Sequence, residues 1–468
     1  MCGFLVTDAI LDDENKVCTF LEHRGPDHTE IKTVEGINFT HTLLSLTGDF
    51  TPQPVTDEHI TVVFNGEIYN YKELGDYSSD VFAIIDSYKK YGFDFIKHLD
   101  GEFAIVLFDA KENLIFFSTD IFATKPLFYS QEITKFGFSS YKTALEEAGF
   151  TNIYKLHANS YGVYYIKNSN LEIFSEYYKF NLDQFKTDYD DWNEAFLNSI
   201  KVRFEDLPHD IILPLSSGLD SGAISCAFEK LKIKHIVFSY YGNEHKIVLF
   251  RRLFRKLINK NKIYIKKSLK QGDFKKTKNL LNSKISKFSY GPKQESESLT
   301  QDGFSDRGSH GLVYLLDYVK SKNENIKILS SGQGGDEITS NLQSYSFGSP
   351  NPKSFDDNLY DIFPWENFYD GTQSSYLMKE ESITGGFGIE GRYPFLDRKV
   401  VQEYLNLVPE LKNKEFKAPI TNFLESNNYP IKTGDPEKTK KGFNIVKENL
   451  IQKAIGFISK KLNRISTK

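Results

Sequence analysis

The sequence predicts an α+β fold of stacked antiparallel sheets with helices, followed by an α/β fold built on a parallel sheet. Short β-branched and aromatic runs, broken by Gly, Asn and Asp, fill the first 180 residues, which favours antiparallel sheets. Beyond residue 190, apolar runs alternate with helical patterns, as in a parallel sheet. The polar stretch near 180–190 separates two predicted domains, residues 1–182 and 190–468. A chain of 468 residues is long enough for both.

The first half contributes four predicted strands and one helix. The strands cover residues 60–71, 102–110, 113–120 and 161–167. Residues 80–92 repeat apolar side chains three and four positions apart, which predicts a helix.

The second half begins with a predicted helix around 190–204. Residues 210–228 then read as a buried strand, a Ser/Gly loop and a helix, the opening of an α/β unit. The pattern of a strand followed by a loop recurs at 235–242 and 325–337, and residues 370–468 are mostly helical in pattern.

Composition indicates a cytoplasmic protein. Three cysteines without paired spacing predict neither a disulfide framework nor a cysteine metal site, and a reducing compartment fits them. No signal-peptide pattern and no apolar stretch near the roughly 20 residues of a membrane span are present. The net charge of −5 implies no general affinity for nucleic acid. Residues 246–287 are strongly basic, but few aromatics interleave them, which favours a solvated, lysine-coated helical surface.

Cys2 is the first candidate catalytic residue. If Met1 is removed, Cys2 carries a thiol and a free α-amine whose pKa is about 7.7–8.0. Such an amine can act as the base for its own side chain. The alternative is that a small residue after the initiator carries no meaning.

Two loops rich in small residues are candidate phosphate sites. Residues 216–222 and 330–337 each follow a predicted strand, and ligands of open α/β sheets bind at the carboxyl ends of strands. Backbone amides there can cradle phosphate, and Asp220 and Asp336 offer the carboxylates that Mg²⁺ prefers. Ordinary tight turns with a helix cap are the alternative.

The ordered motifs of the chain resemble those of the glutamine-dependent asparagine synthetases. In order, they are MCGF (1–4), HRGPD (23–27), NGE (65–67), Ser79-Asp80, GEFA (101–104), KPL (125–127), SSGLDS (216–221), SGQGGDE (331–337), IEGRYPFLD (389–397) and KKGF (440–443). The resemblance covers nearly the whole chain and implies an N-terminal-nucleophile (class-II) glutaminase domain followed by an ATP-pyrophosphatase domain.

The resemblance also implies the site residues. Cys2 would attack the glutamine amide, with the Asn65 side chain and the Gly66 backbone N–H holding the oxyanion, while Glu67 and Asp80 bind the substrate ammonium. Lys440 would stabilise phosphate charge in the second half. ATP would be bound by Leu215, Ser216, Ser217, Gly218, Asp220, Ser221, Tyr240, Ser331 and Gly332, and Mg²⁺ by Asp220 and Asp336. In the family the acceptor is aspartate, the product is asparagine, and a homodimer is the default.

Several positions depart from the family pattern. Leu43 stands where an arginine would bind the glutamine α-carboxylate, and Ser217 replaces the first loop glycine. Gln333 replaces an acid, and Gly385-Gly386 replaces Met-Ala. Two alternatives to asparagine synthesis therefore stay open. One is an amide-forming relative acting on another carboxylate, such as a uronic acid or a peptide, with Gln333 and Gly385-Gly386 marking a changed pocket. The other is a non-catalytic family member.

Overall fold

The computed structural model describes residues 2–11, 14–242, 244–290, 301–322, 325–340 and 354–431. Its contacts divide the chain into two compact units. Unit 1 comprises residues 1–180, 280–304 and 369–391, and unit 2 comprises residues 181–279, 305–368 and 392–468. Two segments from the second half of the sequence thus belong to unit 1. The domain ranges 1–182 and 190–468 remain a prediction.

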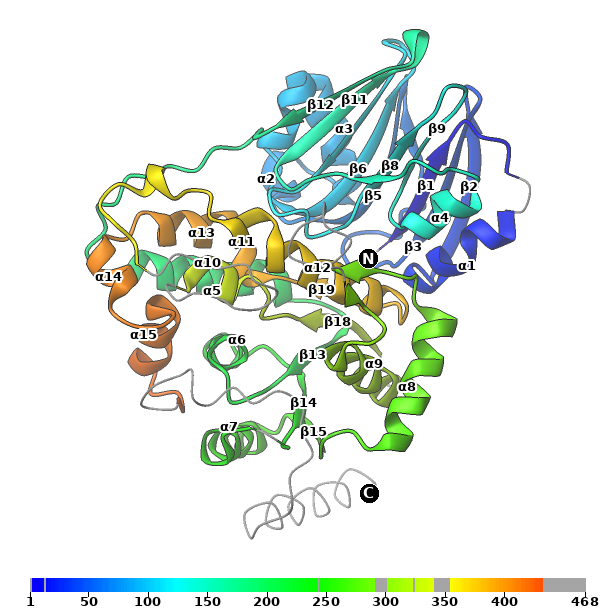
Figure 1. Cartoon of the computed structure of the whole chain (residues 1–468). Helices are drawn as coiled ribbons and strands as arrows, with labels where there is room; N and C mark the ends of the chain where they lie inside the picture. Colours follow the sequence, from blue (N-terminus) through cyan, green and yellow to red (C-terminus); the bar gives the residue numbers. More distant parts are fainter. Residues whose placement is uncertain are drawn as a thin grey trace. The chain divides into compact units, whose positions relative to one another are not determined.

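Unit 1 contains two six-stranded sheets in which each recorded strand pair is antiparallel (Figure 1). The first sheet has the order β10-β8-β9-β1-β3-β2, formed by β10 (Tyr154–Lys155), β8 (Phe128–Gln131), β9 (Phe136–Ser139), β1 (Gly3–Thr7), β3 (Ile37–Leu43) and β2 (His28–Val34). The second has the order β12-β11-β7-β6-β5-β4, formed by β12 (Asn170–Ser175), β11 (Ser160–Tyr165), β7 (Leu114–Thr119), β6 (Gly101–Asp109), β5 (Ile60–Ile68) and β4 (Val55–Asp57).

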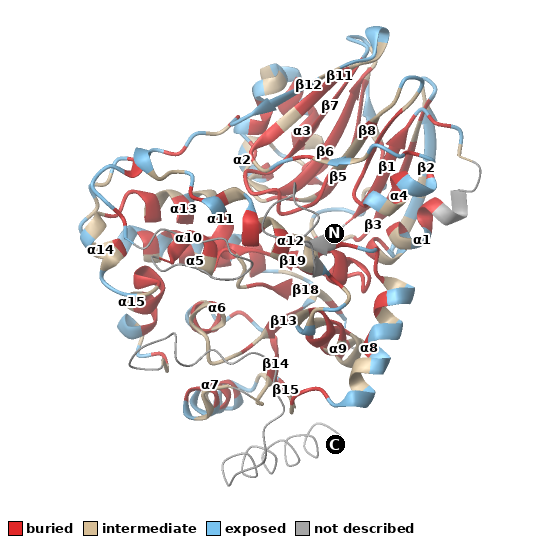
Figure 2. Ribbon diagram, viewed as in Figure 1, coloured by how far each residue is buried: buried red, intermediate tan, exposed pale blue. Residues whose placement is uncertain are grey.

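The main core of unit 1 lies between these sheets. Phe4 of β1 and Phe39 of β3 join one buried cluster with Ala104, Val106 and Phe108 of β6. The spacing of two along β6 is that of one face of a strand. Figure 2 shows β1, β5, β6 and β7 as mostly buried, whereas the edge strands β2 and β12 are largely exposed.

Helices cover the sheets of unit 1. A second buried cluster joins Leu5 of β1 to Leu21 and Leu145, which lie on α1 and α4. The helical segments in the first half of the chain are α1 (Glu14–Arg24), α2 (Tyr71–Leu74), α3 (Asp80–Tyr91), η1 (Gly92–Lys97), α4 (Lys142–Glu147) and η2 (Ile166–Asn168). Unit 1 also contains α12 (Gly371–Gly385) and the short pair β16 (Ser289–Tyr290) and β17 (Gln301–Asp302).

The second half of the chain forms a five-stranded sheet of order β15-β14-β13-β18-β19. Its strands are β13 (Asp210–Pro214), β14 (Ile236–Tyr240), β15 (Lys262–Lys266), β18 (Ile326–Ser330) and β19 (Glu390–Arg392). The recorded pairs β13/β14, β13/β18 and β14/β15 are parallel. The chain moves from β13 to β14 on one side and returns to β18 on the other, so β13 and β18 flank a topological switch point. Ligands of such sheets bind there, outside the carboxyl ends of the strands.

The helices of the second half complete the α/β pattern. They are α5 (Asp190–Phe204), α6 (Leu219–Lys230), α7 (Lys246–Ile258), α8 (Gln271–Lys284), α9 (Arg307–Lys320), α10 (Gly335–Thr339), η5 (Leu359–Asp361), α11 (Glu366–Tyr369), η6 (Pro394–Leu396), α13 (Arg398–Leu405), α14 (Pro409–Asn413) and α15 (Ala418–Ser426). The predicted fold class, antiparallel sheets followed by a parallel α/β sheet, is confirmed. No helix of the described residues is long and apolar enough to cross a membrane.

Residues 246–287 fold as α7, β15 and α8. The lysines of α8 are largely exposed, as the prediction of a lysine-coated surface requires. Arg252 and Lys256 of α7 are an exception, because both are fully buried.

Candidate active sites

Cys2 is held by hydrogen bonds at both ends of its backbone. Its N–H donates to Asn65 Oδ1 of β5 at 2.9 Å, and its carbonyl accepts from Arg24 Nε at 2.7 Å. Burial raises the pKa of the Cys2 thiol to about 11, although the charge of the chain's N-terminus and a hydrogen bond from the Leu44 backbone act in the opposite direction. The thiol is therefore protonated near neutral pH, and a nucleophilic role needs a base.

The orientation of Asn65 fits an oxyanion donor. Because its Oδ1 accepts from Cys2, its Nδ2 is the group left to donate, and within the described residues this buried nitrogen has no hydrogen-bond partner. Gly66 follows with φ +131°, and a Cβ there would lie 1.9 Å from the Glu102 carbonyl oxygen. Glycine is therefore required next to Asn65.

Two carboxylates, those of Glu67 and Asp80, lie beside the end of β5 that carries Asn65 and Gly66. Glu67 follows Gly66 on β5 and accepts a hydrogen bond from Thr47 Oγ1. Asp80, the first residue of α3, accepts from the Ile68 backbone N–H at 3.1 Å. Both are buried, and burial together with the charge of Glu67 raises the pKa of Asp80 well above its ordinary range. Two such carboxylates favour a cation such as a substrate ammonium.

Strand β3 supplies no positive charge to this region. Leu43 ends the strand and is buried. Burial lowers the pKa of His41 on the same strand to about 3, so its ring is neutral at physiological pH. The position where the family's arginine would bind a carboxylate is thus apolar.

A buried charge cluster, which sequence reasoning missed, supports the Cys2 backbone. Glu381 of α12 accepts from Arg24 Nη2 at 2.6 Å and from Lys125 Nζ at 3.0 Å. The three side chains are 0% exposed, and Glu102 lies 3.6 Å from the Lys125 nitrogen. Arg24 and Lys125 belong to recognised motifs, but no local pattern marks Glu381.

The glycine pair in α12 has a steric explanation within this cluster. A Cβ at Gly385 would lie 2.2 Å from the Tyr141 hydroxyl and 2.9 Å from Arg24 Nη1, and one at Gly386 would lie 2.2 Å from Ile285. The Tyr141 hydroxyl accepts from Arg24 Nη1 at 3.2 Å. The close contacts of Gly385 are thus with the cluster around Arg24 and those of Gly386 with Ile285, whereas their link to a changed carboxylate pocket stays a prediction.

In unit 2, the first loop connects β13 to α6, and its polar groups are engaged. The Ser216 N–H donates to Ser221 Oγ at 3.1 Å, and the Gly218 N–H donates to Ser216 Oγ at 3.0 Å. The Ser217 N–H and hydroxyl both donate to Glu244 Oε2, the former at 2.6 Å. Sequence reasoning missed this contact with Glu244. One of the backbone N–H groups predicted to bind phosphate, that of Ser217, is thus hydrogen-bonded to a carboxylate.

Two further predicted nucleotide residues lie on or beside the neighbouring strand β14. Leu215 is buried, and its N–H donates to the Phe238 carbonyl at 2.9 Å. Tyr240 ends β14, and its hydroxyl donates to the Gly311 carbonyl at 2.7 Å.

The second loop approaches the first at Asp220. A Cβ on Gly332 would lie 3.0 Å from the Asp220 Cβ, and one on Gly335 would lie 2.4 Å from Asp220 Oδ1. The Ser331 N–H donates to the Arg392 carbonyl at 3.0 Å, which attaches the loop to β19. The glycines are therefore needed for the two loops to meet.

Lys417 joins the two predicted metal ligands. Its Nζ lies 2.5 Å from Asp220 Oδ1 and 2.8 Å from Asp336 Oδ1, and its side chain is 1% exposed. The adjacent Glu337 is buried, and burial with the charge of Asp336 raises the pKa of Glu337 above its ordinary range. Sequence reasoning missed Lys417, because a lysine near Lys412 carries no distinguishing pattern.

The residues present fit Mg²⁺ when it arrives with phosphate. Asp220 and Asp336 converge on a single cationic nitrogen, and Mg²⁺ is commonly held by one or two carboxylates plus substrate phosphates. Within the described residues no group of three or more His, Cys, Asp or Glu side chains could hold a metal. Lys440, the predicted catalytic lysine, lies outside the described residues.

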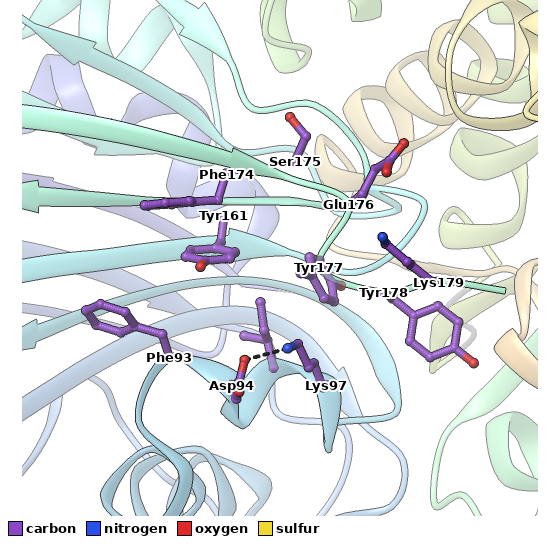
Figure 3. Close-up of a pocket in the computed structure, with 11 residues that line it drawn as sticks. Phe93, Asp94, Lys97, Tyr161, Phe174, Ser175, Glu176, Tyr177, Tyr178 and Lys179 are labelled. Atoms are coloured by element: carbon purple, nitrogen blue, oxygen red, sulfur yellow. Dashed lines mark ion pairs between the residues drawn. The ribbon is translucent and has the colours of Figure 1, made fainter.

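Unit 1 also has a pocket of about 580 Å³ (Figure 3). Tyr161 and Phe174 stack in it with ring centroids 4.8 Å apart, beside the Asp94–Lys97 ion pair. None of the predicted site residues lines it, so it contributes nothing to the chemistry above.

Comparisons with known proteins find similarity in both halves of the sequence. A family model described as a glutamine amidotransferase domain matches residues 1–187. The chain is 26% identical to an asparagine synthetase (glutamine-hydrolyzing) of Arabidopsis thaliana, over 88% of this chain and 71% of that protein. It is 25% identical to a protein of the same name from Oryza sativa, over 88% and 70% of the two chains.

Among solved structures, the allosteric regulatory enzyme of purine biosynthesis matches 57% of this chain and 80% of its own, at 12% identity and a TM-score of 0.33. That likeness is too low to support an argument. The sequence matches cover both halves. Residues 1–187 thus match a glutamine amidotransferase domain, and 88% of the chain is similar to proteins named glutamine-hydrolyzing asparagine synthetases.

Proposed function

We propose that the chain is a glutamine-dependent asparagine synthetase, which uses ATP to activate aspartate and ammonia from glutamine to amidate it. The observation that carries the proposal is the convergence of Asp220 and Asp336 on Lys417, beside a loop of small residues at the carboxyl ends of β13 and β18. A carboxylate pair at this edge of a parallel sheet suits a metal-bound triphosphate.

In the first half-reaction, the Cys2 sulfur attacks the amide carbon of glutamine after the N-terminal amine takes the thiol proton. The C–N bond breaks, ammonia leaves, and water hydrolyses the thioester to glutamate. Asn65 Nδ2 and the Gly66 N–H would stabilise the oxyanion, and each such donor typically contributes on the order of 100- to 1000-fold in rate. Glu67 and Asp80 would orient the substrate through its ammonium group.

In the second half-reaction, a carboxylate oxygen of the acceptor attacks the α-phosphorus of ATP, and pyrophosphate leaves. Ammonia then attacks the acyl carbon, and AMP leaves. The loop of Ser216, Ser217, Gly218 and Ser221 would bind the phosphates, with Leu215, Tyr240, Ser331 and Gly332 lining the nucleotide. Mg²⁺, held by Asp220 and Asp336, would neutralise phosphate charge, and Lys440 is proposed to act on the same phosphates.

The test is ATP–pyrophosphate exchange across candidate acids, with AMP measured as product. Exchange that depends on aspartate supports the proposal. Exchange with a uronic acid or a peptide, but not with aspartate, would identify a relative with a different acceptor. Absence of exchange with every acid would favour a non-catalytic member.

The nitrogen donor is tested separately, by comparing glutamine with ammonium chloride in wild type and Cys2→Ala. The variant should lose only the glutamine-dependent reaction. Loss of both reactions, or of neither, would contradict the role of Cys2.

A further inference from the structure

Arg252 of α7 lies buried beneath the first loop and is not explained by any motif. Its side chain is fully buried, while the neighbouring Arg251 is exposed on the same helix. Arg252 Nη1 donates to the Ser216 carbonyl at 2.8 Å and to the Gly218 carbonyl at 2.7 Å. One guanidinium group thus holds two carbonyls of a single short loop.

These contacts determine where the loop amides point. A carbonyl and the following N–H belong to one planar trans peptide and point in opposite directions. With the Ser216 and Gly218 carbonyls held by Arg252, the N–H groups of Ser217 and Leu219 must point away from it. The Ser217 N–H is in fact donated to Glu244. An anion approaching the loop from that side would therefore meet amide donors.

The buried guanidinium group of Arg252 also requires a residue without a side chain on the neighbouring helix α6. A Cβ on Gly222 of α6 would lie 2.4 Å from Arg252 Nη2, so a side chain there would displace the guanidinium group. Within the described residues, Nη2 is buried and makes no hydrogen bond. A buried donor without a hydrogen bond is costly, so the other contacts of this guanidinium group need a compensating role.

The same side chain also contacts the end of the described chain. Arg252 Nε donates to the Pro430 carbonyl at 2.9 Å, and the guanidinium lies 5.4 Å from the centre of the Tyr429 ring. These contacts join Arg252 to the segment that follows α15.

We propose that Arg252 is a positioning residue that orients the amides of the first loop (residues 216–222) toward a phosphate anion. The inference rests on the proposed ATP-dependent function. It assigns the geometry of the phosphate-binding amides to one residue that lies outside the loop.

The test compares Arg252→Ala and Arg252→Lys with the matched control Arg251→Ala, which removes the same charge from the exposed face of α7. We expect Arg252→Ala to raise the KM for ATP by about 10-fold and to lower kcat for ATP–pyrophosphate exchange by about 100-fold, as misplacement of a site by about 1 Å does. Added guanidinium should restore part of the kcat, Arg252→Lys should lie between, and Arg251→Ala should match wild type.

Folding of unit 2, which contains Arg252, is checked by the fluorescence of Trp192 and Trp365, because both tryptophans belong to that unit. Loop order is checked by hydrogen exchange of residues 211–224 without nucleotide, where Arg252→Ala should exchange faster than Arg251→Ala. Equal rates of hydrogen exchange in Arg252→Ala and Arg251→Ala would overturn the inference. Faster hydrogen exchange in Arg252→Ala with an unchanged KM and kcat for ATP would overturn it as well. If the wild-type protein shows no ATP–pyrophosphate exchange with any acid, the proposed function fails. Hydrogen exchange of the loop then decides whether Arg252 orders it.

Discussion

Replacing Glu381 by glutamine removes one negative charge from the buried cluster behind Cys2. The Glu381 carboxylate accepts hydrogen bonds from Arg24 at 2.6 Å and from Lys125 at 3.0 Å, and none of the three side chains reaches solvent. Glutamine keeps the size of the side chain and one acceptor oxygen. The substitution therefore tests the charge rather than the packing.

The expected cost follows from the burial. Removing one partner of a buried ion pair destabilises a protein by about 3–5 kcal/mol, because the other charge stays uncompensated. Glu102, 3.6 Å from the Lys125 nitrogen, still balances that lysine, so the uncompensated charge is mainly that of Arg24. For a unit of roughly 200 residues, at about 2–4 °C per kcal/mol, the midpoint of thermal unfolding should fall by about 6–20 °C.

The matched control is Glu146→Gln in α4. Glu146 pairs with Lys142 at 3.4 Å, but the two side chains are 47% and 52% exposed, and such pairs contribute less than about 1 kcal/mol. Unfolding should be followed by circular dichroism, because both tryptophans, Trp192 and Trp365, belong to unit 2 and would not report on unit 1. A midpoint for Glu381→Gln within 1 °C of that for Glu146→Gln would refute the reasoning.

Three further predictions concern the two candidate sites. Leu43→Arg supplies the missing cation and should lower the KM for glutamine by about 10- to 100-fold in steady-state glutaminase assays, since a hydrogen bond to a charged group contributes about 1.5–3 kcal/mol; an unchanged KM would show that the carboxylate is bound elsewhere. Alkylation of Cys2 by iodoacetamide should accelerate as pH rises, because only the thiolate reacts. If Met1 is retained, the inflection should follow the raised thiol pKa near 11; in a chain shown by mass to lack Met1 it should fall near the amine pKa of about 8, and a flat profile would contradict both. Lys417→Met should reduce ATP–pyrophosphate exchange by about 100-fold or more, because Asp220 and Asp336 would then repel each other and the triphosphate. The control Lys414→Met, at an exposed neighbouring lysine, should leave the rate unchanged. Equal rates of ATP–pyrophosphate exchange in the two variants would exclude a role for Lys417.

The fold was largely predictable because its strands and helices carry local patterns. The helices predicted at 190–204 and 80–92 correspond to α5 (Asp190–Phe204) and α3 (Asp80–Tyr91). What local patterns could not predict is the membership of α12 in unit 1. One contact that joins α12 to the rest of unit 1 is the hydrogen bond between Arg24 and Glu381, a pair separated by 357 positions.

The same distinction applies to the sites. Asn65, Asp220 and Asp336 could be named because they stand in recognisable motifs beside glycines that their surroundings require. Glu244 and Lys417 could not, because each is defined by a partner in another segment. Lys417 lies 197 positions from Asp220, and Glu244 lies 27 positions from Ser217. No spacing rule relates such residues until the chain is folded.

In the described part of unit 2, charged side chains already stand at the positions where the charges of MgATP are expected. The Lys417 ammonium lies between Asp220 and Asp336, where a cation is expected, and the Glu244 carboxylate takes the Ser217 N–H, where a phosphate oxygen is expected. Nucleotide binding would then replace existing ion pairs and hydrogen bonds instead of satisfying empty groups. The net free energy of nucleotide binding must therefore be smaller than the sum of the new contacts, because the contacts of Lys417 and Glu244 are lost as the new ones form. Arg252 is suited to such an exchange, because it holds the loop carbonyls from the opposite side and can keep the amides in place while their acceptor changes.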